Sequence, residues 1–450
     1  MSKSIKRILI ANRGEIAVRI NRTCRDLGIE TVQVYSDADR DSLAVKLADR
    51  AVCIGKPRSS ESYLNGPLLV NAAVAFKADA IHPGYGFLSE NAEFARQCAS
   101  KGLVWVGPSA GVIDLMGNKA AAIAAAAAAG LRTTPGSKGI LADWQTAAEV
   151  AKSIGYPMLL KASAGGGGRG MRLVRDESAM QEAFSQAQKE AQAAFGDGAL
   201  YLEKFLTKVR HVEVQILADE NLVLHLGERD CSSQRRNQKL VEETPGAGLC
   251  EKLREEICDA AVRLAKSVGY TSAGTIEFIV DDAAQEFYFM EMNTRIQVEH
   301  PVTEMVTGID LVAKQIGIAA GEGLGMSQND IVSRGHSIEC RINAEDPDSG
   351  FAPSPGTVTG YRCPGGPGIR VDSHLFEGYT IPPFYDSLIA KLIVWGSDRD
   401  QALRRMRRAL SEMRVDGVKT TIAFHLRLLR DPEFIAGKIH TRSIEEKYAA

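Results

Sequence analysis

Residues 291–301 read EMNTRIQVEHP and directly follow the run FYFM at residues 287–290. The run FYFM is short, aromatic and free of glycine and proline, which predicts a buried β-strand. Because side chains alternate between the two faces of a strand, we expect Glu291 and Asn293 to point the same way. Two oxygen ligands on one strand face suit a hard cation such as Mg²⁺. Arg295, Gln297 and Glu299 follow at once, so this stretch is the centre of the predicted site.

A second predicted strand, residues 275–281, precedes this stretch and is joined to it by a short turn. Antiparallel pairing of the two strands would bring Glu277 close to Glu291 and Asn293. Carboxylates placed so closely repel each other unless a cation lies between them. The alternative, that these residues form ordinary surface ion pairs, loses support once Glu277 is included. We therefore expect Mg²⁺ or Mn²⁺ to bind at Glu277, Glu291 and Asn293.

The composition limits the class of protein. The 450 residues correspond to about three domains. A hydrophobic content of 45% with 24% charged residues is typical of a globular protein with a large core, and a net charge of −2 provides no basic surface for nucleic acid or an anionic membrane. The apolar run at residues 8–11 is too short for a signal peptide, and residues 120–131 are too short to span a bilayer. Together with eight scattered cysteines and no CxxC pair, this predicts a soluble cytoplasmic protein.

Strands and helices are expected to alternate through the first 115 residues. Apolar runs at residues 7–12, 31–35, 51–54, 80–81 and 104–106 predict a doubly wound parallel sheet, with a helix capped by Ser89 before the last strand. Such sheets bind ligands at the carboxyl ends of their strands. The loops NRG at residues 12–14 and HPGYG at residues 82–86 lie at such ends. Neither loop contains GxGxxG, so a dinucleotide site is disfavoured.

A predicted lid follows. Residues 116–133 contain an alanine-rich connecting helix that begins near Lys119, and residues 134–205 form a separate unit. In this unit the segment ASAGGGGRG, residues 162–170, separates two strands and follows Lys161. A glycine-rich hairpin lets backbone amides approach phosphates, although it is not a P-loop and could also be a merely flexible turn.

Residues 206–450 form the predicted C-terminal unit. Residues 210–217 alternate strictly, so their polar row faces either solvent or the wall of a polar cleft. Residues 228–239 are predicted to be a polar loop, and its cations favour anion binding over a simple solvated connection: Arg229, Arg235, Arg236 and Lys239.

Four specific motifs occur in order: ANRGEIA at residues 11–17, HPGYGFLSEN at residues 82–91, KAS at residues 161–163, and EMNTRIQVEH at residues 291–300. With these motifs the chain resembles biotin carboxylase, an ATP-grasp enzyme, essentially from end to end. The resemblance implies an α/β fold that becomes α+β in the C-terminal part. It further implies an N-terminal doubly wound parallel-sheet domain, a mobile glycine-rich lid and a homodimer.

The resemblance also implies roles for the matched positions. ATP would be bound by Lys119, Lys161, Gly167, Gly168, Glu203, Lys204, Phe205, Leu206, His211, Gln234, Asn237, Glu277 and Glu291. Bicarbonate would be bound by Lys239, Arg295, Gln297 and Val298. Glu299 would be the general base and Arg341 the residue that holds carboxyphosphate and biotin, so the catalytic set is Arg295, Glu299, Lys239 and Arg341. Relatives often carry histidine at the position of Asn237, which can hydrogen-bond a ribose but cannot titrate.

The implied reaction is the carboxylation of biotin by ATP and bicarbonate, as in the first half-reaction of acetyl-CoA carboxylase in fatty acid synthesis. The same half-reaction in a pyruvate, propionyl-CoA or urea carboxylase is the alternative. The sequence contains no AMKM biotin-attachment motif, so the expected partners are a biotin carboxyl carrier protein and carboxyltransferase subunits. Another ATP-grasp ligase, or a regulatory subunit without activity, would fit less well because Glu277, Glu291, Arg295 and Glu299 are all present.

Overall fold

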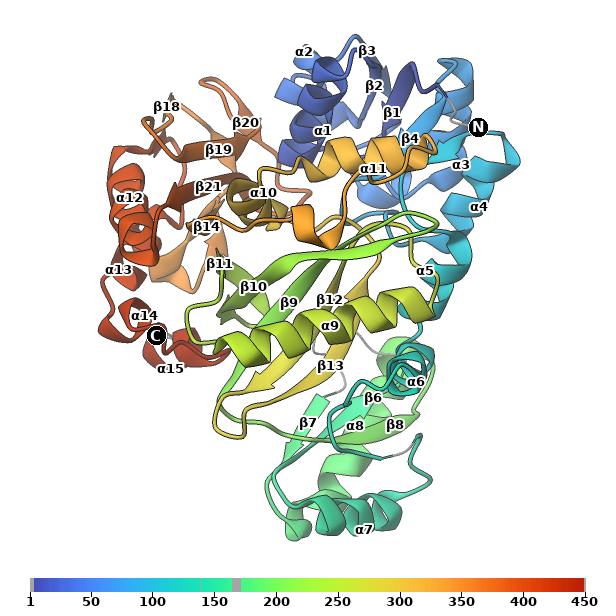
Figure 1. The fold of residues 1–450 in the computed structure, drawn as a ribbon, viewed down its shortest axis with the longest axis vertical. Coiled ribbons are helices and arrows are strands. Elements are labelled where there is room, and N and C mark those ends of the chain that lie inside the picture. Colours follow the sequence, from blue (N-terminus) through green and yellow to red (C-terminus); the bar gives the residue numbers. More distant parts are fainter. Residues whose placement is uncertain (1–3, 138, 164–170, 449–450) are drawn as a thin grey trace.

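The computed structural model describes residues 4–137, 139–163 and 171–448 (Figure 1). Its N-terminal part contains a five-stranded parallel sheet in the order β3-β2-β1-β4-β5. The elements are β1 (Arg7–Ile10), α1 (Gly14–Asp26), β2 (Glu30–Tyr35), α2 (Leu43–Leu47), β3 (Arg50–Cys53), α3 (Gly66–Ala75), β4 (Ala80–His82), α4 (Ala92–Ser100) and β5 (Val104–Trp105).

Alternate side chains of β1 enter two different cores, one on each face of the parallel sheet. Ile8 and Ile10 pack with α1, whereas Leu9 packs with α3 and α4. This arrangement confirms the predicted doubly wound α/β domain. The predicted cap was wrong: Asn91, not Ser89, caps α4, because its side chain accepts a hydrogen bond from the Phe94 amide at 2.8 Å.

The segment after β5 forms two helices and a small layered unit, which extends to the lower end of the view in Figure 1. Its elements are α5 (Ala110–Gly117), α6 (Lys119–Ala128), α7 (Trp144–Ile154), β6 (Met158–Ala162), β7 (Met171–Val174), α8 (Met180–Phe195) and β8 (Leu200–Lys204). The alanine-rich run is helical, as predicted. The strands form an antiparallel sheet in the order β7-β6-β8, and α7 and α8 share one core with it. Gly167 and Gly168 lie outside the described residues.

The largest sheet has eight antiparallel strands in the order β13-β12-β9-β10-β11-β14-β21-β19. They are β9 (Val209–Ala218), β10 (Val223–Arg235), β11 (Gln238–Thr244), β12 (Ser272–Asp281), β13 (Glu286–Asn293), β14 (His336–Asn343), β19 (Ile369–Ser373) and β21 (Leu388–Gly396). Helix α9 (Glu251–Ser267) packs on the apolar row of β9. The opposite row, Glu213 and Gln215, is also buried, so it faces the interior rather than solvent.

The polar loop predicted at residues 228–239 is wrong. This segment is the end of β10 and the start of β11, joined by a turn in which Arg236 and Asn237 have positive φ angles of 48° and 62°. The composition was misleading because Arg229 is fully buried and paired within the sheet rather than solvated. Arg229 is therefore a buried structural cation and does not belong to an exposed anion site.

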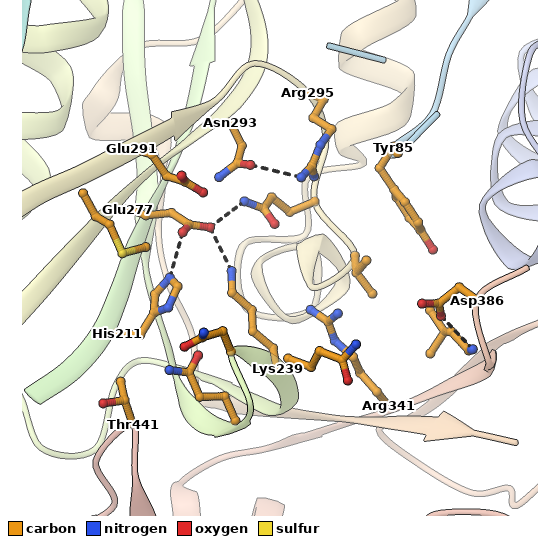
Figure 2. Close-up of a pocket in the computed structure, with 18 of the residues that line it drawn as sticks. Tyr85, His211, Lys239, Glu277, Glu291, Asn293, Arg295, Arg341, Asp386 and Thr441 are labelled. Carbon is orange, nitrogen blue, oxygen red and sulfur yellow. Dashed lines mark hydrogen bonds and ion pairs between the residues drawn. The ribbon is translucent and has the colours of Figure 1, made fainter. Parts of the chain in front are cut away.

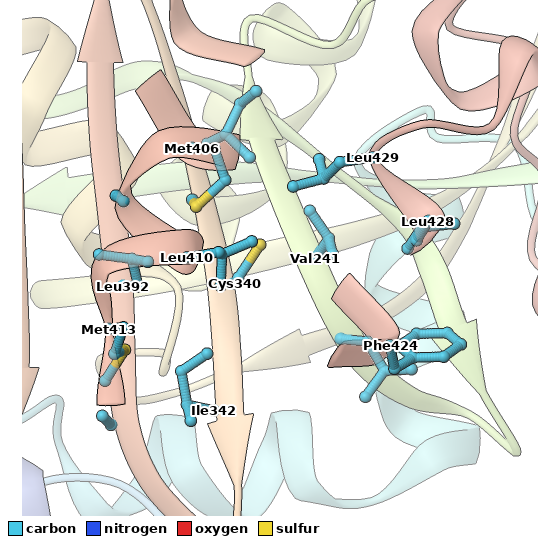
Figure 3. Packing of buried hydrophobic residues seen from close by; sticks show 14 of the residues in the cluster. Val241, Cys340, Ile342, Leu392, Met406, Leu410, Met413, Phe424, Leu428 and Leu429 are labelled. Atoms are coloured by element: carbon cyan, nitrogen blue, oxygen red, sulfur yellow. The ribbon is translucent and has the colours of Figure 1, made fainter. Parts of the chain in front are cut away.

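The helices of the C-terminal region pack on different parts of the large sheet. They are α10 (His300–Thr307), α11 (Leu311–Ala319), α12 (Arg399–Glu412), α13 (Ile422–Leu428), α14 (Pro432–Ile435) and α15 (Ser443–Tyr448). Short strands lie between them: β15 (Glu345–Asp346), β16 (Ala352–Pro353), β17 (Gly356–Thr357), β18 (Gly360–Arg362), β20 (Thr380–Ile381) and β22 (Arg414–Asp416). In Figure 3, Cys340 and Leu392 of the sheet meet Met406 and Leu410 of α12 and Phe424 of α13 in one apolar cluster.

In the described part of the chain, no single helix is long and apolar enough to cross a membrane. Only α5 and α6 taken together pass that test, and the pair is bent by 97°.

Replacing Leu410 with alanine tests the packing of α12 on the sheet. Leu410 is 1% exposed. The cavity left by truncation is expected to lower the free energy of unfolding by about 2–5 kcal/mol, as measured by urea denaturation followed by circular dichroism. Leu27→Ala, at a position that is 48% exposed, is expected to cost less than about 0.5 kcal/mol. Equal losses in the two variants would contradict this packing.

Candidate active site

A cleft of about 960 Å³ opens between the N-terminal sheet, the small unit that contains β6–β8, and the large sheet. Figure 2 shows that Glu291 and His211 lie on one side of it in the view, with Tyr85 and Asp386 on the other. Most of the predicted site residues line this cleft: Lys161, Glu203, Lys204, Phe205, Leu206, His211, Gln234, Asn237, Lys239, Glu277, Glu291, Asn293, Arg295, Gln297, Val298 and Arg341. Positions that are far apart in the sequence thus come together.

Two predicted residues do not line the cleft directly. Glu299 lies fully buried behind the wall, where it contacts the side chains of Lys239 and Arg341. Lys119 is the first residue of α6. Its positive charge opposes, but does not cancel, the rise in the Glu291 pKa that burial and Glu277 cause. Both positions are therefore coupled to the cleft through charge.

Glu277 and Glu291 are direct cross-strand partners in the β12–β13 ladder, as the sequence predicted. Glu277 lies 3.0 Å from His211 Nε2 and 3.0 Å from Lys239 Nζ, and it accepts a 3.0 Å hydrogen bond from Gln297 (Figure 2). Burial raises the pKa of the Glu277 carboxyl, but Lys239 and His211 outweigh burial and hold it well below its usual range. Glu277 is therefore ionised.

Glu291 has the opposite electrostatic character. Burial and the negative charge of Glu277 raise the pKa of Glu291 above its ordinary value. Asn293 follows on the same strand, and its Oδ1 accepts a 3.0 Å hydrogen bond from the Arg295 guanidinium. Two carboxylates and an amide oxygen thus lie close together, and a cation between the carboxylates would relieve the repulsion that raises the pKa of Glu291. This donor set fits a hard divalent cation such as Mg²⁺.

Glu299 is held between two cations. Lys239 donates to one of its oxygens at 2.6 Å, and Arg341 donates to the other at 3.0 Å. Burial alone would raise the pKa of Glu299, but Lys239 and Arg341 reverse the effect and hold this pKa below its ordinary value. Glu299 is an ionised carboxylate that can accept a proton.

Arg341 is oriented by a second carboxylate that the sequence analysis missed. Its Nε donates to Glu242 at 2.6 Å, while another nitrogen of the guanidinium reaches Glu299. Burial raises the pKa of Glu242 to about 7 despite the opposing charge of Arg341. No local pattern marks Glu242, because it lies in the middle of β11 and its role depends on the neighbouring strand β14.

Arg295 connects the cleft to the N-terminal domain. Its Nε donates to Glu90 at 2.9 Å, and another nitrogen donates to the Asn293 side chain at 3.0 Å. Glu90 also accepts a 3.0 Å hydrogen bond from the Thr294 amide. The motif at residues 82–91 therefore fixes both the guanidinium and the chain that leaves β13.

The small unit contributes two lysines to the cleft. The Lys161 ammonium contacts the Glu203 carboxylate, so this cation is oriented toward the strand that ends at Lys204. Lys204 itself donates to the carbonyls of Gly155 and Tyr156 at 2.8 and 2.9 Å. Phe205 and Leu206 continue the wall toward β9. This part of the cleft combines the apolar side chains of Phe205 and Leu206 with the cation of Lys161, a combination that suits a nucleotide.

Three protein-family models match the chain in succession. The biotin carboxylase N-terminal domain matches residues 4–113. The ATP-binding domain of the carbamoyl-phosphate synthase L chain matches residues 118–327. The biotin carboxylase C-terminal domain matches residues 339–446.

Individual relatives agree over nearly the whole length. A biotin carboxylase from Nostoc sp. is 57% identical over 98% of both chains. A pyruvate carboxylase subunit of Methanothermobacter thermautotrophicus is 52% identical over 98% of this chain and 89% of its own. A solved structure, the biotin carboxylase domain dimer of Hydrogenobacter thermophilus 2-oxoglutarate carboxylase with MgADP, ADP and bicarbonate, has a TM-score of 0.93 at 52% identity, covering 99% of this chain and 98% of that one.

Glu291→Gln tests the cation site. Replacing the carboxylate with an amide removes a charged ligand and the repulsion with Glu277, so we expect Mn²⁺ to bind at least about tenfold more weakly while the free protein keeps its stability. Electron paramagnetic resonance of Mn²⁺ in the presence of ADP measures the binding. Glu255→Gln, on the exposed face of α9, is the control. Unchanged Mn²⁺ affinity in Glu291→Gln would rule out this ligand set.

Proposed function

Because the chain belongs to the biotin carboxylase family, we propose that its cleft couples ATP cleavage to the carboxylation of biotin with bicarbonate. The observation that carries the proposal is the buried, ionised Glu299 between Lys239 and Arg341, next to a cleft with a divalent-cation donor set. An acyl phosphate intermediate requires such a combination of base, cations and metal.

The nucleotide occupies the part of the cleft nearest the small unit in this proposal. The adenine ring lies against the edge formed by Glu203, Lys204, Phe205 and Leu206, with His211, Gln234 and Asn237 on the ribose side. Lys119 and Lys161 neutralise the phosphates, assisted by the backbone around Gly167 and Gly168. Glu277, Glu291 and Asn293 would hold Mg²⁺ or Mn²⁺, and the cation would neutralise phosphate charge.

Bicarbonate binds next to the γ-phosphate, held by Lys239, Arg295, Gln297 and Val298. Glu299 accepts the bicarbonate proton as the bicarbonate oxygen attacks phosphorus, and the bond from phosphorus to ADP breaks. Lys239 and Arg295 stabilise the negative charge that develops on the transferred group. The products of this step are carboxyphosphate and ADP.

Biotin is carboxylated in the second step. Carboxyphosphate releases CO₂ and phosphate, the phosphate takes the proton from the ureido nitrogen of biotin, and the nitrogen attacks CO₂. Arg341 and Arg295 stabilise the enolate-like oxygen of the ureido group. Water must be excluded because carboxyphosphate is labile, and closure of the residue 134–205 unit over the cleft would achieve this.

The proposal extends to partners and organisation. We infer that biotin arrives on a separate carrier protein, that carboxyltransferase subunits use the product, and that the chain forms a homodimer, as the Hydrogenobacter domain does. Acetyl-CoA is the proposed final acceptor, with pyruvate, propionyl-CoA or urea as the alternative. The similar proteins include a pyruvate carboxylase subunit and a 2-oxoglutarate carboxylase domain, which keeps the alternative open. The division into residues 1–115, 116–133, 134–205 and 206–450 and the cytoplasmic location stay predictions.

Glu299→Gln tests the proposed base. The amide keeps the shape of the side chain but cannot accept the bicarbonate proton, so ATP cleavage with Mg²⁺ and free biotin is expected to fall about 10²–10⁴-fold. The assay compares phosphate release with and without bicarbonate. Glu255→Gln is the control for a surface charge change. Cleavage that is indifferent to bicarbonate in the unsubstituted protein would favour another ATP-grasp ligase, and tight ATP binding without cleavage would favour a regulatory subunit.

The raised pKa of Glu242 predicts a pH dependence for biotin use. Glu242 carries its full charge only above about pH 7, and the ionised form holds Arg341 more firmly. We therefore expect kcat/KM for free biotin to rise by up to about tenfold between about pH 6 and about pH 8. The Glu242→Gln variant is expected to lack this rise. Ionisation of biotin or phosphate affects the unsubstituted protein and Glu242→Gln alike. Identical pH profiles of kcat/KM in these two proteins would therefore contradict the role of Glu242.

A further inference from the structure

A fully buried lysine, Lys391, contacts the segment of residues 295–299, called here the proposed bicarbonate loop. It belongs to β21, its side chain is 0% exposed, and it lines no part of the cleft in the described residues. Its ammonium donates to the Val298 carbonyl at 2.8 Å and lies 3.1 Å from Glu15 Oε1. Asp372 is farther away, at 4.0 Å, and already pairs with Arg370.

The partner Glu15 comes from the opposite end of the chain. It lies on α1 and is buried, and its Oε1 also accepts a hydrogen bond from the Tyr85 hydroxyl. Tyr85 lines the cleft (Figure 2). Glu15 therefore connects three segments: the first helix of the N-terminal domain, a cleft side chain and strand β21 of the large sheet.

Stability alone does not account for this ion pair. Burying a lysine and a glutamate costs desolvation free energy that their attraction roughly offsets, and apolar side chains of similar size often stabilise a core as well. An ion pair supplies what apolar side chains cannot, namely directed hydrogen bonds. Here Lys391 donates to the Val298 carbonyl, and Glu15 accepts from the Tyr85 hydroxyl. Val298 and Tyr85 both line the cleft.

The geometry also relates Lys391 to Arg341. The two residues are register partners on β21 and β14, so both side chains leave the same face of the sheet. Arg341 holds the Glu299 carboxylate, and Lys391 holds the carbonyl of the preceding residue, Val298. Because a peptide unit is planar, fixing that carbonyl fixes the direction in which the chain enters Glu299.

We propose that Lys391 and Glu15 are positioning residues for Glu299, with Lys391 fixing the Val298–Glu299 peptide and Glu15 anchoring Lys391 to α1. The inference rests on the proposed function, in which Glu299 is the base. Lys391 does not line the cleft in the described residues, and Glu15 lines it beside Tyr85, so in this inference both residues act through Glu299. A base displaced by a fraction of an ångström loses rate rather than nucleotide affinity.

The experiment compares Lys391→Met with the double variant Glu15→Gln/Lys391→Met. The single variant leaves the Glu15 charge buried and unpaired, so both stability and rate are expected to fall. The double variant removes both charges, so its thermal midpoint is expected to recover. We expect kcat for bicarbonate-dependent ATP cleavage to stay about 10- to 100-fold low in both variants, with KM for ATP within about twofold of the original value. Recovery of kcat together with stability would overturn the inference.

Amide hydrogen exchange supplies a readout that does not depend on activity. Loss of the Lys391 hydrogen bond is expected to speed exchange in residues 294–300 in both variants. Arg254→Met is the matched control, because it also leaves a buried carboxylate, Glu228, without its ion-pair partner but lies outside the bicarbonate loop. Exchange that is unchanged in Lys391→Met, or equally faster in the control, would overturn the inference. An unsubstituted chain without bicarbonate-dependent cleavage would instead refute the proposed function, and exchange would still decide whether Lys391 fixes the loop.

Discussion

The cleft depends on one buried charge cluster around Lys239. Its ammonium contacts three carboxylates, Glu213 at 2.5 Å, Glu277 at 3.0 Å and Glu299 at 2.6 Å. Behind them the fully buried Arg229 donates to Glu213 at 2.6 Å. Buried charges are tolerated only when they are paired and hydrogen-bonded, so none of these side chains can be placed without the others. Since they come from β9, β10, β11, β12 and the start of α10, the cluster fixes the register of the sheet and the geometry of the site together.

The same requirement links the parts of the molecule. Arg295 pairs with Glu90, and Lys391 of β21 pairs with Glu15 while donating to the Val298 carbonyl, so ion pairs help to link residues 295–298 to the N-terminal domain. An apolar interface between the two domains would tolerate small shifts of one domain against the other. A guanidinium or ammonium that must keep its hydrogen bonds tolerates them less, because each broken bond leaves a charge unsatisfied. The loop therefore keeps one orientation relative to both neighbouring domains.

Local patterns predicted the elements whose partners lie close in sequence. Glu277 and Glu291 could be paired beforehand because a short turn joins their strands and side chains alternate with a period of two. The alanine-rich helix followed from intrinsic propensity in the same way. The loop prediction for residues 228–239 was wrong because a polar composition normally indicates exposure to solvent. Here Arg229 is instead paired with a carboxylate from another strand. Glu242 and Lys391 were missed for a related reason: each lies in a strand of ordinary appearance, and its role comes from a residue far away in the sequence.

The distribution of charge within the cleft explains how binding and chemistry can be ordered. Around Glu299 the cations already outweigh burial and lower its pKa, so this carboxylate is ionised and is held in place by Lys239 and Arg341. Around Glu291 the balance is reversed, because burial and the Glu277 charge raise its pKa. Under the proposed function, a divalent cation bound with the nucleotide would relieve that repulsion. Charge that is already paired around Glu299 and repulsion that is not yet relieved around Glu291 would then favour nucleotide binding before proton transfer.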